Sequence, residues 1–385
     1  MIVGGSLANA EIDDWVPQIQ ALGQEAGGGG GPGLQAADLK FQRIGFGALS
    51  ARDVSMSVRP NGPNWAITLD GKGAHGHLLW PSDSRGEVFA RLEDMNLAYA
   101  VSNEDDGDDG AVLNPMELPT VDLQINRLQL NRTALGQLRL LSARIPDGQR
   151  LAELNLGGGE LTLSASGQWW RQEQRSGAEL AFDAQSGAVS RVLAAFGYVQ
   201  TLEARRTRLN GDLRWSPSAD GVAWSQARGK VNVKVDNGIL RAVEPGAGRV
   251  LGLMNFYALP RRLTLNFRDV VGQGLSFDSI GGEFQLGDGD AVTRNLVVDA
   301  PSLRIETRGR IGLAAKDYDQ RVTVYPDVSA GVTLASALLG GPALGALMLI
   351  AQEILDKPLD QATQLSYHLG GTWDNPRVTR VDGGG

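Results

Sequence analysis

Hydrophobic and polar residues alternate with a period of two along most of this 385-residue chain. From Glu160, the segment ELTLSASG places Leu161 and Leu163 on one side and Thr162 and Ser164 on the other. Because successive side chains of a strand point to opposite faces, such a segment predicts a strand with one apolar and one polar face. The same alternation recurs at residues 54–58, 65–69, 231–235, 263–267 and 303–313.

Turn signals divide the alternating segments into hairpins. They are Asn61-Gly62, Asp147-Gly148, Asp220-Gly221, Asn237-Gly238 and Asp288-Gly289. Two meanders are predicted, at about 39–99 and 121–183, with the acidic segment 104–109 as a solvated loop between them. The alternation slips by one residue near Arg127, which indicates a β-bulge. Each meander contains a strand that starts at a glycine (47–58 and 136–145) and a strand that ends in tryptophan (Trp80 and Trp169), an echo typical of stacked repeats.

Helical patterns are few, at 11–22, 190–199, 248–258 and 332–355. So few helices cannot cover one face of some twenty strands. The apolar faces must therefore pack on each other, as in a sandwich or barrel, or line something. We expect an N-terminal helix and glycine-rich linker at 1–33, a first β-segment at 34–186, and a C-terminal region at 187–385 with apolar helices at 332–357.

The charge distribution excludes one class of function. The net charge of −8 comes from scattered acids, whereas a nucleic-acid-binding protein would carry a clustered basic stripe. The chain has no cysteine, which excludes a disulfide scaffold and thiolate chemistry. Its first residues lack the basic region of a signal peptide and are too short an apolar stretch to span a membrane.

Residues 332–351 contain no charge and are long enough to span a bilayer. The break at Gly340-Gly341-Pro342 favours a helical hairpin packed on the strands, with interfacial membrane contact as the alternative. Under that alternative the candidate membrane-contact residues are Leu338, Leu339, Leu344, Leu347 and Leu349.

Motifs for catalysis or metal binding are incomplete. His75 and His77 could point the same way from one strand, but nothing adjacent supplies a third metal ligand. The acidic run from Glu104 places Gly107 and Met116 where a calcium loop needs ligands. The glycines from Gly246 lack the spacing of a dinucleotide or phosphate loop. The sequence therefore predicts a protein that is not an enzyme and carries no metal or cofactor.

The C-terminal half resembles a known family. The stretch from Asn237, NGILRAVEPGAGRVLGLMNFYALPRRLTLNFRDVVGQGLSFDSIGGEFQLGDG, is similar to the C-terminal portion of the AsmA-like superfamily, most closely the YhdP type. Further similarity lies in YDQRVTVYP from Tyr318, GGPALGALMLIAQEILDKPLD from Gly340 and GTWDNPRV from Gly371. The resemblance extends from about residue 189 to 378, and LANAEIDDW from Leu7 looks like the family's entry into this stretch.

The resemblance implies a mainly β fold: an elongated, curved antiparallel sheet forming a U-shaped hydrophobic groove. It implies that the chain is the C-terminal piece of a longer protein of the Gram-negative periplasm. An N-terminal helix would anchor that protein in the inner membrane, and its C-terminal end would face the outer membrane. Phospholipid acyl chains would slide along the apolar floor, and envelope proteins are possible further partners.

Under this hypothesis, the candidate lipid-binding residues are Leu161, Leu163, Leu303, Ile305, Val322 and Val324. An alternative hypothesis is a periplasmic scaffold that assists outer-membrane protein assembly through exposed strand edges. A third is an extended β enzyme acting on envelope polysaccharide, which would need clustered carboxylates on the polar face. Bound phospholipid would distinguish the first hypothesis from the other two.

Overall fold

The structure is a computed structural model. It describes residues 2–11, 35–46, 48–83, 85–99, 114–172, 175–198, 200–218, 221–222, 224–241, 275–301, 303–326, 364–373 and 375–381. Most of these residues lie in strands, which confirms the predicted mainly β class. The chain divides into two units, which are described separately below. Unit 1 comprises Met1–Phe182, Ala195–Gly197 and Pro217–Gly221, and unit 2 comprises Asp183–Ala194, Tyr198–Ser216 and Val222–Gly385.

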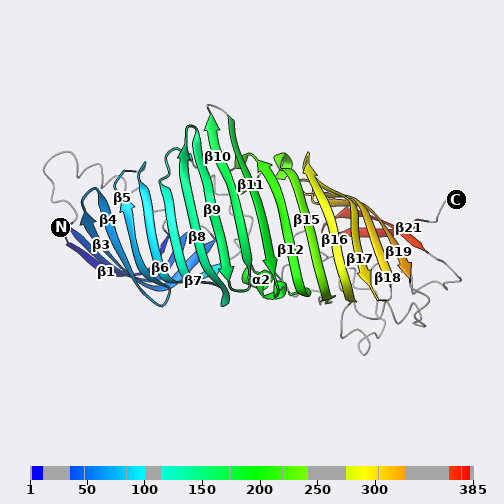
Figure 1. The fold of residues 1–385 in the computed structure, drawn as a ribbon, viewed down its shortest axis with the longest axis horizontal. Coiled ribbons are helices and arrows are strands. Elements are labelled where there is room, and N and C mark those ends of the chain that lie inside the picture. The colour runs from blue at the N-terminus through cyan, green and yellow to red at the C-terminus, as the bar shows by residue number, and fades with distance from the viewer. Residues whose placement is uncertain are drawn as a thin grey trace. The chain divides into compact units, whose positions relative to one another are not determined.

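Unit 1 is built from long strands joined mainly by tight turns (Figure 1). Its strands are β1 (Ile2–Glu11), β2 (Ala36–Phe46), β3 (Leu49–Asn61), β4 (Asn64–Gly71), β5 (Ala74–Pro81), β6 (Glu87–Tyr99), β7 (Thr120–Leu130), β8 (Thr133–Ile145), β9 (Gly148–Gly158) and β10 (Thr162–Gln172). Strand β11 (Arg175–Ser186) contains the boundary between the units and is followed by the short helix α2 (Val189–Ala195).

Most neighbouring strands of unit 1 are antiparallel, but two pairs are parallel. β1 pairs with β2, and β6 pairs with β7, in parallel register. Parallel neighbours need a crossover of a dozen or more residues, and the chain between these strands is long enough to supply it. The prediction of an antiparallel sheet is therefore right for most strand pairs and wrong at these two parallel joints.

The hairpin β4–β5 is inserted between β3 and β6. The later part of β3 pairs with β4, whereas its first residues, Leu49–Ala51, pair directly with β6. The turn between β4 and β5 fits at this point because residue 73 is glycine. A side chain at this position would collide with the backbone carbonyl of Arg52. The sheet thus has two more strands at one end of β3 than at the other.

Unit 2 is a continuous antiparallel meander (Figure 1). Its strands are β12 (Leu202–Trp215), β15 (Arg228–Leu240), β16 (Leu275–Gly287), β17 (Asp290–Ala300), β18 (Leu303–Gly312), β19 (Asp317–Pro326), β20 (Leu365–Thr372) and β21 (Pro376–Val381). In the chain between β12 and β15 lie the short strands β13 (Pro217–Ser218) and β14 (Gly221–Val222), which pair with each other, and the 3₁₀ turn η1 (Trp224–Gln226). β13 and Gly221 belong to unit 1.

Several local predictions are confirmed. The turns at Asn61-Gly62, Asp147-Gly148 and Asp288-Gly289 join consecutive antiparallel strands. The register of β7 against β8 shifts between Ile125 and Leu128, where the alternation slips. The helix predicted at 190–199 is present as α2.

Other local predictions are wrong or lie outside the described residues. Asn237-Gly238 lies within β15 and is not a turn, because the residues on both sides of Asn237 stay paired with β12, Asp236 with Arg206 and Gly238 with Ala204. Asn237 nevertheless has the positive φ, 51°, that its turn-like sequence favours. Residues 2–11 form β1, with Glu11 at its end and no part in the helix predicted at 11–22. The remainder of that helix, the helix at 248–258 and the apolar helices at 332–357 lie outside the described residues.

Candidate functional site: the apolar and polar faces of the strands

In unit 1, apolar side chains from one face of the strands pack into a cluster. Its buried members are Leu92, Ile125, Leu128, Leu130, Leu135, Leu156 and Ala195. Half-buried leucines and other apolar side chains pack around them: Leu49, Leu69, Met95, Leu97, Tyr99, Leu123, Leu138, Leu161 and Leu163. These strands therefore carry an apolar face that remains partly open to solvent.

Of the candidate lipid-binding residues, Leu161 immediately precedes β10 and Leu163 is its second residue; both belong to this half-buried set. Leu163 is directly opposite Leu156 of β9, a buried member of the cluster. Thr162 and Ser164, between and beyond them, are exposed. The period of two predicted from the sequence is thus confirmed at this strand.

In unit 2, the other four candidates share one face of β18 and β19. Ile305 is paired with Val324, and both belong to a cluster that also contains Leu303, Val322 and Tyr367. These side chains are only 0–3% exposed. The structure therefore brings the four residues together but covers them with other protein atoms.

The candidate membrane-contact residues, Leu338, Leu339, Leu344, Leu347 and Leu349, lie outside the described residues. None of the helices in the described part of the chain has the length and apolarity that a membrane crossing requires.

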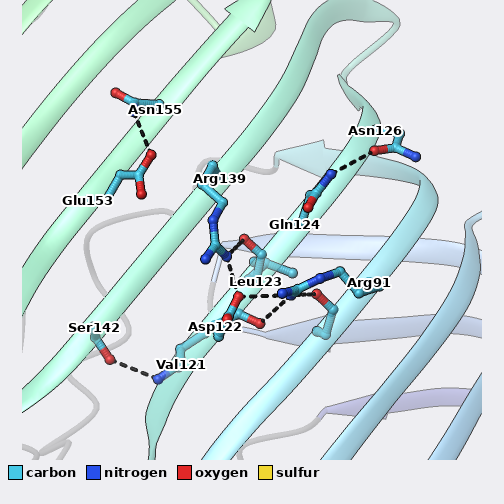
Figure 2. Close-up of polar contacts among 11 residues, drawn as sticks. Arg91, Val121, Asp122, Leu123, Gln124, Asn126, Arg139, Ser142, Glu153 and Asn155 are labelled. Atoms are coloured by element: carbon cyan, nitrogen blue, oxygen red, sulfur yellow. Dashed lines mark hydrogen bonds and ion pairs between the residues drawn. The ribbon is translucent and has the colours of Figure 1, made fainter.

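The polar face of unit 1 is fastened by ion pairs across the parallel joint between β6 and β7. Asp122 of β7 is held between Arg139 of β8 and Arg91 of β6, whose Nη1 lies 2.8 Å from Asp122 Oδ1 (Figure 2). Arg127 binds both carboxylate oxygens of Asp94 at 2.7 Å and also contacts Glu93. These contacts tie β6 to β7 and β7 to β8.

The electrostatics of this face disfavour acid catalysis. Hydrogen bonds from Arg139 and then Arg91 lower the pKa of Asp122 from 3.8 to about 2. The other displaced carboxyl pKa values among the described residues are also lowered, in each case chiefly by an arginine: Asp38, Asp94, Glu203 and Asp317. A general acid at neutral pH needs a raised pKa, so these five carboxyl groups are not suited to that role.

Metal ligation has no candidate site in the described ranges, where no group of three or more His, Cys, Asp or Glu side chains could hold an ion. His75 lies beside Asp70 and opposite Asp94, and His77 lies beside Thr68.

Sequence reasoning missed the two parallel joints and the arginine–carboxylate contacts. The long segments before β2 and β7 were the available signal for the joints, because only a long connection can return the chain to the same edge in the same direction. The ion pairs depend on register between strands distant in sequence, which a single strand's pattern does not specify.

Fold and site together define a class: a strand-built protein whose strands carry an apolar face and a face with arginine–carboxylate ion pairs. The chain belongs to the YhdP protein family, whose family model matches residues 1–378. A curated relative from Escherichia coli (strain K12), "Intermembrane phospholipid transporter YhdP", is 26% identical over 220 residues. That match covers 57% of this chain but only 17% of the relative's length. No solved structure matches the chain significantly.

Proposed function

We propose that this chain contributes a hydrophobic path along which phospholipid acyl chains move between the inner and outer membranes of a Gram-negative envelope. The name of the curated relative, which describes intermembrane phospholipid transport, supports the proposal. In this proposal the chain acts in the periplasm, and the full-length protein is anchored in the inner membrane. Its C-terminal end faces the outer membrane and supports lipid homeostasis and barrier integrity there.

The observation that carries the proposal is the one-sided apolar face of unit 1. Leu161 and Leu163 remain half-buried, so an acyl chain could lie against them without displacing a packed core. In unit 2, Ile305 and Val324 are covered, and lipid contact there requires the covering atoms to move apart. We therefore expect Leu161 and Leu163 to contact lipid more readily than the residues of β18 and β19.

The physical gain from such a path is large. Burying one methylene group contributes about 0.8 kcal/mol, so an acyl chain of about fifteen methylenes gains on the order of 12 kcal/mol. Apolar contact is non-directional, so the path should accept several phospholipid classes. A passive face also supplies no direction, which must come from a gradient or a partner.

The test places a charge on the path and, as a control, on the opposite face of the same strand. Leu163→Arg should lower the amount of phospholipid that co-purifies with the chain severalfold, because an unpaired charge on the apolar face is costly to bury beside acyl chains. Ser164→Arg, one residue further and exposed, should leave it unchanged. Phospholipid per protein is measured by mass spectrometry, and circular dichroism checks that both variants fold.

A photoreactive residue at position 163 should crosslink to phospholipid, whereas one at position 164 should not. The proposed path would be contradicted if Leu163→Arg and Ser164→Arg retained equal amounts of phospholipid and if the photoreactive residues at positions 163 and 164 crosslinked to it equally.

A further inference from the structure

The polar face of unit 2 contains a depression where β15, β16 and β17 meet. The register of β16 against β17 shifts between Gly281 and Phe284, because three residues of β17, 294–296, lie opposite the two residues Gly282 and Glu283 of β16. The depression has a volume of about 370 Å³. Its lining combines polar residues with apolar residues and glycines: Asn232, Val233, Lys234, Ser279, Ile280, Gly281, Gly282, Glu283 and Asn295. Small-ligand sites in proteins start at about 300 Å³, so the space suffices for a small polar group.

The floor of the depression is open because residue 281 is glycine. A Cβ at this position would meet only the carbonyl oxygen of Val233, at 3.9 Å. Gly281 is also absent from the positions with positive φ, so its backbone would accept other residues without strain. Backbone strain therefore does not explain the glycine at position 281, and its effect is to leave the space above it open. Gly282 differs, since a Cβ there would press on Leu296 on the apolar side at 2.8 Å.

The lining presents hydrogen-bond donors. Asn295 Oδ1 accepts a hydrogen bond from the backbone N–H of Glu283 at 3.0 Å, which leaves the amide nitrogen of Asn295 free to donate. Asn232 uses one N–H on Asn210 Oδ1 at 3.2 Å and has a second. The one carboxylate of the lining, Glu283, lies 3.7 Å from the ammonium of Lys230.

Charge at the rim is also positive. Lys234 is directly opposite Arg208 in the pairing of β15 with β12. Like charges directly opposite each other destabilise a sheet. Arg208 lies 3.8 Å from Asp183, so its charge is partly compensated, as that of Glu283 is by Lys230 at 3.7 Å. An anion between Lys234 and Arg208 would relieve the remaining repulsion.

We infer that this depression binds a phosphate-bearing anion through Lys234, Asn295 and Asn232, with Arg208 adding positive charge. The ammonium and amide N–H groups match the acceptor oxygens of a phosphoryl group, and charge-assisted hydrogen bonds are the strong ones. The phosphoryl group could belong to a phospholipid headgroup or to a soluble phosphate ester. Within unit 2, this site lies on the polar face of β15 and β16, and it does not depend on the proposed lipid path.

The test measures how fast the Lys234 amine is acetylated in the whole chain, with peptide mass spectrometry as the readout. Two probes are used in parallel: soluble glycerol phosphate, and vesicles of phosphatidylglycerol compared with phosphatidylcholine. At ten times the dissociation constant, a bound phosphoryl group should slow acetylation roughly tenfold. Protection by glycerol phosphate identifies a site for soluble esters, and protection by phosphatidylglycerol vesicles alone identifies a headgroup site.

Two matched variants locate the effect. Gly281→Val fills the depression and should abolish protection of Lys234. Gly287→Val lies on the same strand, at a glycine with no atom within 4 Å of its Cβ position, and should preserve protection. The inference is overturned if neither probe protects Lys234, or if Gly281→Val leaves the protection unchanged.

Discussion

The arginine–carboxylate contacts around Asp122 predict a specific loss of stability when that carboxylate is neutralised. Asp122→Asn keeps the shape of the side chain but removes the charge held between Arg139 and Arg91. The pKa of Asp122 is lowered from 3.8 to about 2. Since one pKa unit corresponds to about 1.4 kcal/mol, the ionised carboxylate stabilises the folded state by up to about 2.5 kcal/mol. The side chain is 19% exposed, and solvent screening brings the expected loss to between about 1 and 2 kcal/mol.

The pH dependence has a definite sign. A carboxyl whose pKa is lowered on folding contributes its full stability above the unfolded pKa, near pH 4, and loses it as the pH falls toward about 2. The difference in unfolding free energy between the wild type and Asp122→Asn should therefore be constant from about pH 5 to pH 8. By about pH 3 it should have fallen by roughly half.

Urea denaturation across this pH range measures the difference directly. Asp288→Asn is the matched control, because the side chains of Asp288 and its partner Arg228 are 88% and 72% exposed, and ion pairs between exposed side chains contribute little. A loss below about 0.5 kcal/mol for Asp122→Asn at pH 7, or a loss that does not shrink on acidification, would refute the electrostatic role assigned to Asp122.

Three further substitutions test the packing of unit 2 by denaturant unfolding. Ile305→Ala should lower the unfolding free energy by about 2–5 kcal/mol, since Ile305 is 3% exposed; a loss below about 1 kcal/mol would mean that its neighbours are not packed. Gly309→Ala should cost roughly 1–3 kcal/mol, because Gly309 has a φ of 137° and a Cβ there would collide with the backbone of Asp319; a neutral outcome would show that the strands can separate at this point. Arg310→Lys removes the forked contact with both oxygens of Asp317, at 2.8 and 2.9 Å, and should cost about 1 kcal/mol, with a gain in stability contradicting that role.

The strands and their apolar faces could be predicted from the sequence because alternation is a local property. At β10, Leu161, Leu163, Thr162 and Ser164 take the predicted sides. The turn at Asp288-Gly289 was equally readable, because both residues take the positive φ that such pairs favour, 53° and 84°.

The remaining features could not be predicted because they depend on pairing between distant strands. Asn237-Gly238 has the composition of a turn, yet pairing with β12 and β16 keeps it inside β15. The close packing of Ile305 against Val324, and the space above Gly281, likewise follow from register. A period of two indicates which residues share a face and is silent on what covers that face.

The parallel joints have a consequence for how such a chain can change in length. β2 is antiparallel to β3, β3 is antiparallel to β6, and β6 is parallel to β7, so β2 and β7 run in the same direction. β1 is parallel to β2 and would therefore be parallel to β7 if β2–β6 were removed. A five-stranded block bounded by two such joints can be duplicated or lost during evolution without reversing any later strand. The number of strands in such a sheet can thus change in steps of five, with the direction of every remaining strand unchanged.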